Sequence, residues 1–107
     1  MREQRIAIYD TVIEKCSRFE RKGKANPYTA SNGHMFSQIN KDGQLGIRFS
    51  KKQQQAYFEE FDTGPFLSYG SVMRGYVLMP DWIWEDQVKM EELLNEGFDY
   101  VNTLEPK

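Results

Sequence analysis

The first stretch of the chain mixes apolar and charged residues with the period of a helix. Its apolar members, spaced three or four positions apart, are Ile6, Tyr9, Ile13 and Cys16. Residues with this spacing share one face of a helix, and the charged residues between them fill the other face. The pattern predicts an amphipathic helix over residues 3–21, and Gly23 just beyond it is a typical stop signal.

Two turn signals divide the next segment into strands. Asn32-Gly33 is a preferred pair for a type I′ hairpin turn, which needs positive φ at both central residues. Asp42-Gly43 supplies the chemistry of a second turn. Beyond it, residues 44–49 alternate between apolar and other residues with period two, which is typical of a strand. The predicted strands of this antiparallel meander lie at 28–29, 34–39 and 44–49.

The second half of the chain predicts two helices separated by two strands. Ser50 can cap a helix from Lys51 to about Phe61, because its hydroxyl can accept a hydrogen bond from a free backbone N–H. Asp86 can cap a final helix that continues to about residue 103. The apolar face of this last helix consists of Met90, Leu94, Phe98 and Val101. The two strands between the helices are expected at 66–69 and 73–79.

The predicted elements follow the order α-β-β-β-α-β-β-α. This order indicates an α+β fold, a two-layer sandwich with helices packed on a five-stranded antiparallel sheet. A length of 107 residues fits one domain, so we take 1–107 as a single unit. A sheet of this kind has two edges that must be covered or blunted, and a homodimer is one way to do so.

Cysteine and histidine are too scarce for an intrachain disulfide or a four-ligand zinc site. Cys16 and His34 are the only residues of their types. Aromatic residues make up 14% of the chain, so we expect a packed core. The N-terminus lacks an apolar signal-peptide core, and no apolar run approaches the length of a membrane helix. We therefore expect a cytoplasmic protein with no membrane contact, no metal and no cofactor.

The net charge is only −2, but the basic and acidic residues are distributed unevenly along the chain. Residues 1–58 hold 11 basic and 5 acidic residues, whereas residues 81–107 hold 2 basic and 8 acidic ones. The basic cluster near the end of the first predicted helix contains Lys15, Arg18, Arg21, Lys22 and Lys24. This cluster could contact a phosphate backbone, so nucleic-acid binding is one alternative function. We favour a solvated helix end, where the helix dipole stabilises cations.

Two short blocks carry a recognisable pattern. They read Pro27-Tyr28-Thr29 and, three residues later, Asn32-Gly33-His34-Met35-Phe36-Ser37. The further blocks are Lys41-Asp42-Gly43-Gln44-Leu45, Arg48, Val72-Met73, Tyr76-Val77, Pro80, Tyr100-Val101, Leu104 and Pro106-Lys107. Together these residues resemble one branch of the TfoX/Sxy N-terminal-domain-like family. The resemblance extends from about residue 9 to the end of the chain.

This resemblance implies helices on a five-stranded antiparallel sheet and a regulatory or partner-binding module without established catalytic residues. Our leading interpretation is therefore a small non-enzymatic domain that binds a protein partner, with a link to transcriptional or competence regulation. The candidate contact residues on the predicted hairpin are Tyr28, Thr29, Asn32, His34 and Phe36. These residues also have a structural explanation, because the turn requires Asn32-Gly33 and the core requires Met35 or Phe36.

His34 raises a third alternative, because histidine ordinarily titrates near neutral pH. A small-molecule site or an uncharacterised enzyme could use the His34 hairpin, with Cys16 as a nucleophile. Cys16 lies on an apolar helix face, however, where a free cysteine usually behaves as a buried small hydrophobe. His34 beside a tight turn is better explained by a hydrogen bond to a neighbouring strand or turn. We therefore assign no catalytic residue.

Overall fold

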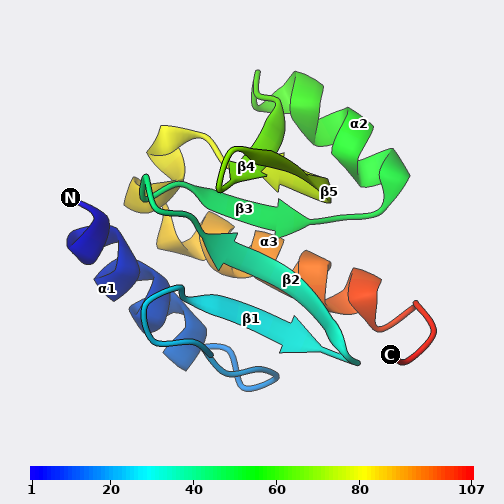
Figure 1. Cartoon of the computed structure of the whole chain (residues 1–107), viewed down its shortest axis with the longest axis horizontal. Coiled ribbons are helices and arrows are strands. Elements are labelled where there is room, and N and C mark those ends of the chain that lie inside the picture. Colours follow the sequence, from blue (N-terminus) through cyan, green and yellow to red (C-terminus); the bar gives the residue numbers. More distant parts are fainter.

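The computed structural model describes all 107 residues. It contains three α-helices and one open sheet, whose arrangement can be followed in Figure 1. The helices are α1 (Arg2–Glu14), α2 (Lys51–Glu60) and α3 (Gln87–Val101), and a 3₁₀ helix, η1, spans Asp81–Glu85. The strands are β1 (Tyr28–Ser31), β2 (His34–Ile39), β3 (Leu45–Arg48), β4 (Pro65–Ser68) and β5 (Ser71–Leu78). The predicted α+β architecture and element order are confirmed.

The five strands form one antiparallel sheet in the order β1-β2-β3-β5-β4. Helix α3 crosses behind β2 and β3 and contacts both, while α1 lies towards the β1 side and packs on α3 (Figure 1). Helix α2 contacts β5 and is tied to α3 by a hydrogen bond from Tyr57 to Glu96. As predicted, Ser50 caps α2 and Asp86 caps α3.

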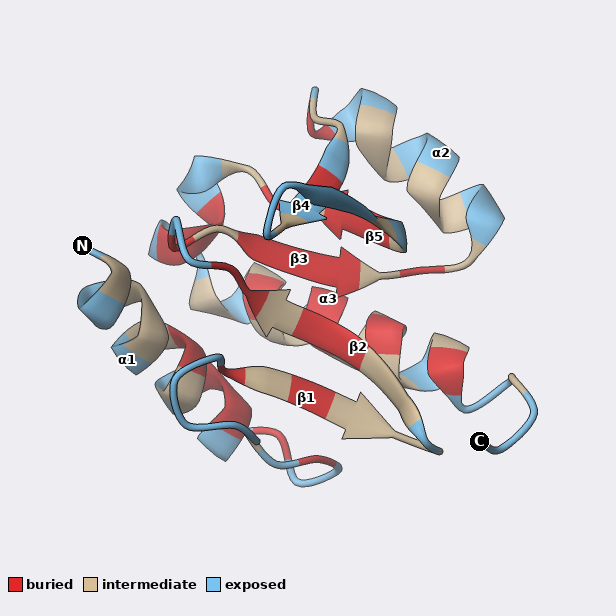
Figure 2. Ribbon diagram, in the orientation of Figure 1, coloured by how far each residue is buried: buried red, intermediate tan, exposed pale blue.

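The core lies between the sheet and the helices α1 and α3. Figure 2 shows the buried residues gathered on β2, β3 and the facing sides of these helices. At its centre the Phe36 ring contacts Phe19 and Phe98, with ring centroids 5.1 and 5.9 Å away, both edge to face. Burial of three such rings makes a large apolar contribution to stability.

The predicted helix over residues 3–21 is too long, because α1 ends at Glu14. The chain then reverses and brings Phe19 into the core, where its ring stacks on Phe98 at 5.4 Å. If the helix continued to residue 21, the chain would not reverse and Phe19 would not reach Phe98. The tertiary burial of Phe19 therefore overrides the local helical pattern.

A kink in β5 curls the outer part of the sheet. Gly75 has φ +89°, and the pairing of β4 with β5 shifts register between Pro65 and Leu67. The curl lays Phe66 of β4 against Gly46 of β3, although β5 separates these two strands in the sheet. Phe66 is fully buried as a result.

Asn40, in the turn between β2 and β3, holds the curled hairpin in place. Its side chain donates to the carbonyl oxygen of Leu67 at 2.8 Å and accepts from the backbone N–H groups of Asp42 and Gln44. On the opposite edge of the sheet, Tyr28 exchanges two backbone hydrogen bonds with Lys22. Both sheet edges are thus partly closed by groups of the chain itself.

We expect Gly46→Ala to destabilise the fold, because an added Cβ would lie less than 3.0 Å from three atoms of the Phe66 ring. The resulting overpacking should lower the free energy of unfolding by about 1–3 kcal/mol in a urea denaturation experiment. Gly64→Ala is the matched control, because a Cβ there meets nothing within 4 Å. Equal stability of the two variants would contradict the proposed role of the Phe66–Gly46 contact.

Candidate functional site

The predicted hairpin forms, but its polar residues contact the end of the same chain. Asn32 and Gly33 have φ values of 58° and 82°, as a type I′ turn requires. The Asn32 side-chain amide donates to the carbonyl oxygens of Val101 at 3.0 Å and Leu104 at 2.9 Å. His34 Nε2 lies 2.8 Å from the carbonyl oxygen of Glu105. We call residues 102–107 the tail; it occupies the surface that Asn32 and His34 present. The hydrogen bonds that Asn32 and His34 make there are called the clasp.

The other three hairpin candidates do not join Asn32 and His34 on one surface. Phe36 is fully buried in the core. Thr29 is also fully buried, and Tyr28 is half-buried beside the backbone of Lys22. The five candidate residues therefore serve different parts of the fold.

Thr29 belongs to a buried group of three hydroxyls that the sequence did not reveal. Ser37 Oγ lies 2.5 Å from both the Tyr9 hydroxyl and Thr29 Oγ1, and none of the three residues is exposed. Burial raises the pKa of Tyr9 far above its usual value, although the hydrogen bonds with Ser37 and Thr29 oppose this shift. These hydroxyls join α1 to β1 and β2 and satisfy one another away from water.

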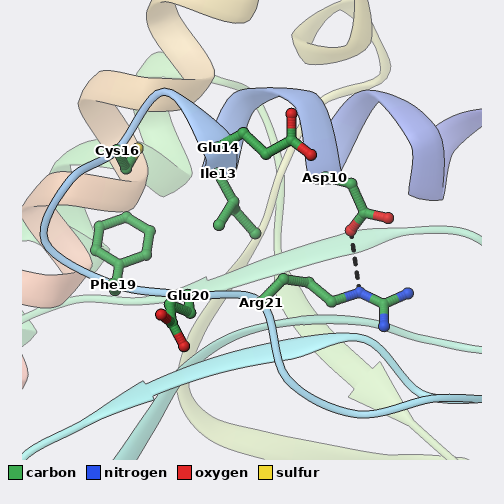
Figure 3. Close-up of a pocket in the computed structure, with 7 residues that line it drawn as sticks. All are labelled: Asp10, Ile13, Glu14, Cys16, Phe19, Glu20 and Arg21. Atoms are coloured by element: carbon green, nitrogen blue, oxygen red, sulfur yellow. Dashed lines mark hydrogen bonds and ion pairs between the residues drawn. The ribbon is translucent and has the colours of Figure 1, made fainter.

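An open hollow of about 440 Å³ lies between α1 and the segment that follows it (Figure 3). We call it the α1 hollow; its lining residues are Asp10, Ile13, Glu14, Cys16, Phe19, Glu20 and Arg21. It arises because the chain reverses after α1, so residues 16–21 face the helix that precedes them. The hollow could not be predicted from helical periodicity, which continued the helix through these positions.

The α1 hollow combines an apolar floor with a charged rim. In Figure 3 Glu14 lies on α1, Glu20 on the facing segment, and Ile13 and Phe19 between them. Arg21 Nε donates to Asp10 Oδ1 at 3.0 Å, so this guanidinium is already paired. Burial raises the pKa of the Cys16 thiol, with a smaller contribution from Glu91. A neutral, buried thiol is a poor nucleophile, so Cys16 serves the core as expected.

The basic cluster is partly neutralised. Arg18 pairs with Asp99 of α3, and its guanidinium carbon lies 4.2 Å from the centroid of the Phe98 ring. Arg21 pairs with Asp10, whereas Lys15, Lys22 and Lys24 are exposed and make no ion pair. The basic segment and the acidic last helix thus lie beside each other and neutralise part of the potential phosphate-binding charge.

The tip of the β4–β5 hairpin exposes a second kind of surface. Leu67 and Val72 are direct partners across the hairpin, and Tyr69 occupies its turn. Their exposed fractions are 46% for Leu67, 57% for Val72 and 68% for Tyr69. The Tyr69 hydroxyl donates to Asn26 Oδ1 at 3.1 Å. We call these three residues the hairpin strip; composition alone did not distinguish them from core residues.

Several other features bear on the chemistry of the chain. No group of three or more His, Cys, Asp or Glu side chains is arranged to hold a metal ion. None of the helices has both the length and the apolar character needed to cross a membrane. Of the two tryptophans, Trp84 is buried, while Trp82 is partly exposed and packs edge to face on Phe61.

No protein-family model matches the chain, and no curated protein matches it.

We expect Asn32→Gly to release the tail while preserving the turn, because glycine keeps the positive φ but removes both side-chain hydrogen bonds. Hydrogen exchange at the amides of Leu104 and Lys107, which donate to Val101 and Asn32, should become roughly tenfold faster or more, since a net hydrogen bond contributes about 1 kcal/mol and two are lost. Asn26→Gly is the control: Asn26 lies outside the contact with the tail, so this substitution should leave the exchange rates unchanged. Unaltered protection in Asn32→Gly would contradict the clasp.

We expect stability to fall in alkaline solution because folding holds Tyr9 as the neutral phenol. Its contribution is complete below the unfolded-state pKa of about 10 and decreases above it, by up to about 1.4 kcal/mol per pH unit. Urea unfolding between about pH 8 and about pH 11 should show a smaller fall for Tyr9→Phe, which has no phenol to ionise. Parallel curves for the two proteins would contradict this linkage.

Proposed function

We propose that this chain is a small non-enzymatic regulatory domain that binds a protein partner through the hairpin strip. The observation that carries the proposal is the exposure of Leu67, Tyr69 and Val72 together on one hairpin. Single exposed apolar residues are ordinary, but neighbouring ones are typical of interaction surfaces. A tyrosine among them adds a large contact area together with a hydroxyl for hydrogen bonding.

The surroundings of the hairpin strip favour recognition through its side chains over pairing of a partner strand with its backbone. The Asn40 side chain donates a hydrogen bond to the backbone carbonyl oxygen of Leu67. A partner strand would have to displace this side chain in order to extend the sheet at β4. Phe66, on the inner side of the hairpin, is fully buried and anchors the strip against Gly46. A surface held in this way loses little conformational entropy on binding, which favours affinity.

The resemblance to the TfoX/Sxy N-terminal-domain-like family supports a regulatory role, with transcription or competence as the process and the cytoplasm as the location. The nucleic-acid alternative has less support, because Arg18 and Arg21 of the basic cluster are engaged in ion pairs. The His34 alternative has less support as well, because the His34 ring contacts the tail. It lines neither the α1 hollow nor the shallow second hollow between α2 and the end of α3.

We expect Leu67→Ser combined with Val72→Ser to abolish capture of a specific partner from a native lysate. Loss of two central apolar contacts should weaken binding by roughly 2 kcal/mol or more, or about thirtyfold. Val88→Ser is the matched control, because Val88 is an exposed apolar residue on α3, away from the hairpin. The captured protein should then be purified and its affinity for each variant measured by calorimetry.

Two outcomes would contradict the proposal. One is a purified partner that binds the double variant as tightly as the original chain. The other is the absence of any partner together with turnover in an activity screen, which would favour an enzyme. The far-UV circular dichroism of the double variant must match that of the original chain for either comparison to count.

A further inference from the structure

The turn of the β1–β2 hairpin contains the only asparagine of the chain that is followed by glycine. The other asparagines precede proline, lysine, glutamate and threonine. An asparagine side chain can react with the backbone nitrogen of the next residue, and glycine has no side chain to hinder this attack. Gly33 is exposed, and its N–H donates to no carbonyl oxygen of the chain. Asn32 is therefore the asparagine best suited to this reaction.

The backbone conformation of the turn keeps the two reacting groups apart. Asn32 has φ 58°, in the left-handed region, where ψ is typically about +47°. At such a ψ the Gly33 nitrogen and the Asn32 Cβ lie on opposite sides of the Cα–C bond. A five-membered ring needs these two atoms on the same side. The ring can therefore close only after the turn has left its native conformation.

The tail and the end of α3 fix both the side chain and the backbone of Asn32. Its Nδ2 donates to the carbonyl oxygens of Val101 at 3.0 Å and Leu104 at 2.9 Å. Its carbonyl oxygen accepts from the N–H of Lys107 at 3.2 Å. The Lys107 carbonyl oxygen covers Gly33, where an added Cβ would lie less than 3.0 Å from it. Rotation at Asn32 breaks these contacts, so the tail must leave before the ring can close.

We propose that Asn32 is a site of spontaneous deamidation whose rate is set by the clasp. When the clasp opens, the Gly33 nitrogen loses its proton to a base in the solvent and forms a bond to Asn32 Cγ. The Cγ–Nδ2 bond breaks, and the side-chain nitrogen takes up a proton and leaves as ammonia. The resulting succinimide adds one water molecule and opens to aspartate or isoaspartate. The net change replaces the side-chain NH₂ by OH, with water consumed and ammonia released.

The reaction also destroys the clasp that slows it. An amide donates through its nitrogen, whereas a carboxylate can only accept a hydrogen bond. Aspartate at this position faces the carbonyl oxygens of Val101 and Leu104 with no proton to donate, so both contacts are lost. Deamidation thus releases the tail permanently. This site is separate from the hairpin strip and does not depend on partner binding.

The test follows deamidation of the purified full chain in mildly alkaline buffer, both folded and unfolded by guanidinium chloride. After digestion with pepsin in acid, which slows the reaction, mass spectrometry detects the exchange of NH₂ for OH in each peptide. We expect this change first at Asn32, and at least tenfold faster in the unfolded chain, because two net hydrogen bonds restrain the side chain. Protection of Asn32 should equal or exceed the hydrogen-exchange protection of the Lys107 amide, since the tail must open before the ring closes.

His34→Ala weakens the clasp without changing the reacting groups. In the native chain His34 Nε2–H donates to the carbonyl oxygen of Glu105. Loss of this bond should speed deamidation of the folded chain roughly fivefold, the effect of one net hydrogen bond, and leave the rate in the unfolded chain unchanged. His34→Gln is the matched control, because its amide can still donate to Glu105, and its rate should stay close to that of the original chain.

Asn32→Asp carries the side chain of the product and tests the release of the tail. Aspartate tolerates the left-handed conformation, so the turn should persist. Hydrogen exchange at the amides of Leu104 and Lys107 should become roughly tenfold faster or more. The proposal would be overturned by equal deamidation rates in the folded and unfolded chains, or by weaker protection at Asn32 than at Lys107. It would also be overturned by an unchanged rate in His34→Ala or unchanged exchange in Asn32→Asp.

Discussion

The contact between Phe66 and Gly46 is the constraint on which the outer half of this molecule depends. It exists because β5 kinks at Gly75 and because Gly46 has no side chain to keep the ring away. The same contact has two consequences on opposite sides of the hairpin. It holds the hairpin strip in a fixed position towards solvent, and on the inner side it brings the Phe66 ring to 6.0 Å from the Tyr76 ring, centroid to centroid.

The elements of the fold were predictable because their signals are local. Ser50 and Asp86 cap helices, and Asn32-Gly33 forms its turn, through hydrogen bonds and backbone preferences that span a few residues. The end of α1 was not predictable in this way. The ring of Phe19 lies at helical spacing, but its partners Phe36 and Phe98 are distant in sequence, so only the assembled core shows where the helix must stop.

The same distinction applies to the candidate sites. Turn chemistry identified Asn32, and the titration of histidine near neutral pH identified His34. Neither signal indicated the tail that both residues contact about 70 residues later. The α1 hollow depends on the reversal after α1, and the group of three buried hydroxyls depends on how α1 packs on β1 and β2. None of these arrangements has a sequence spacing that could reveal it, because each joins elements that only tertiary packing brings together.

The clasp between the hairpin and the tail also bears on the order in which the chain folds. Asn32 and Leu104 are separated by 72 positions, so closing this contact early would cost much chain entropy. The β1–β2 hairpin, by contrast, needs only a two-residue turn and can form at once. The clasp is therefore the kind of contact that forms last and opens first, so the tail belongs to the least cooperative part of the native state.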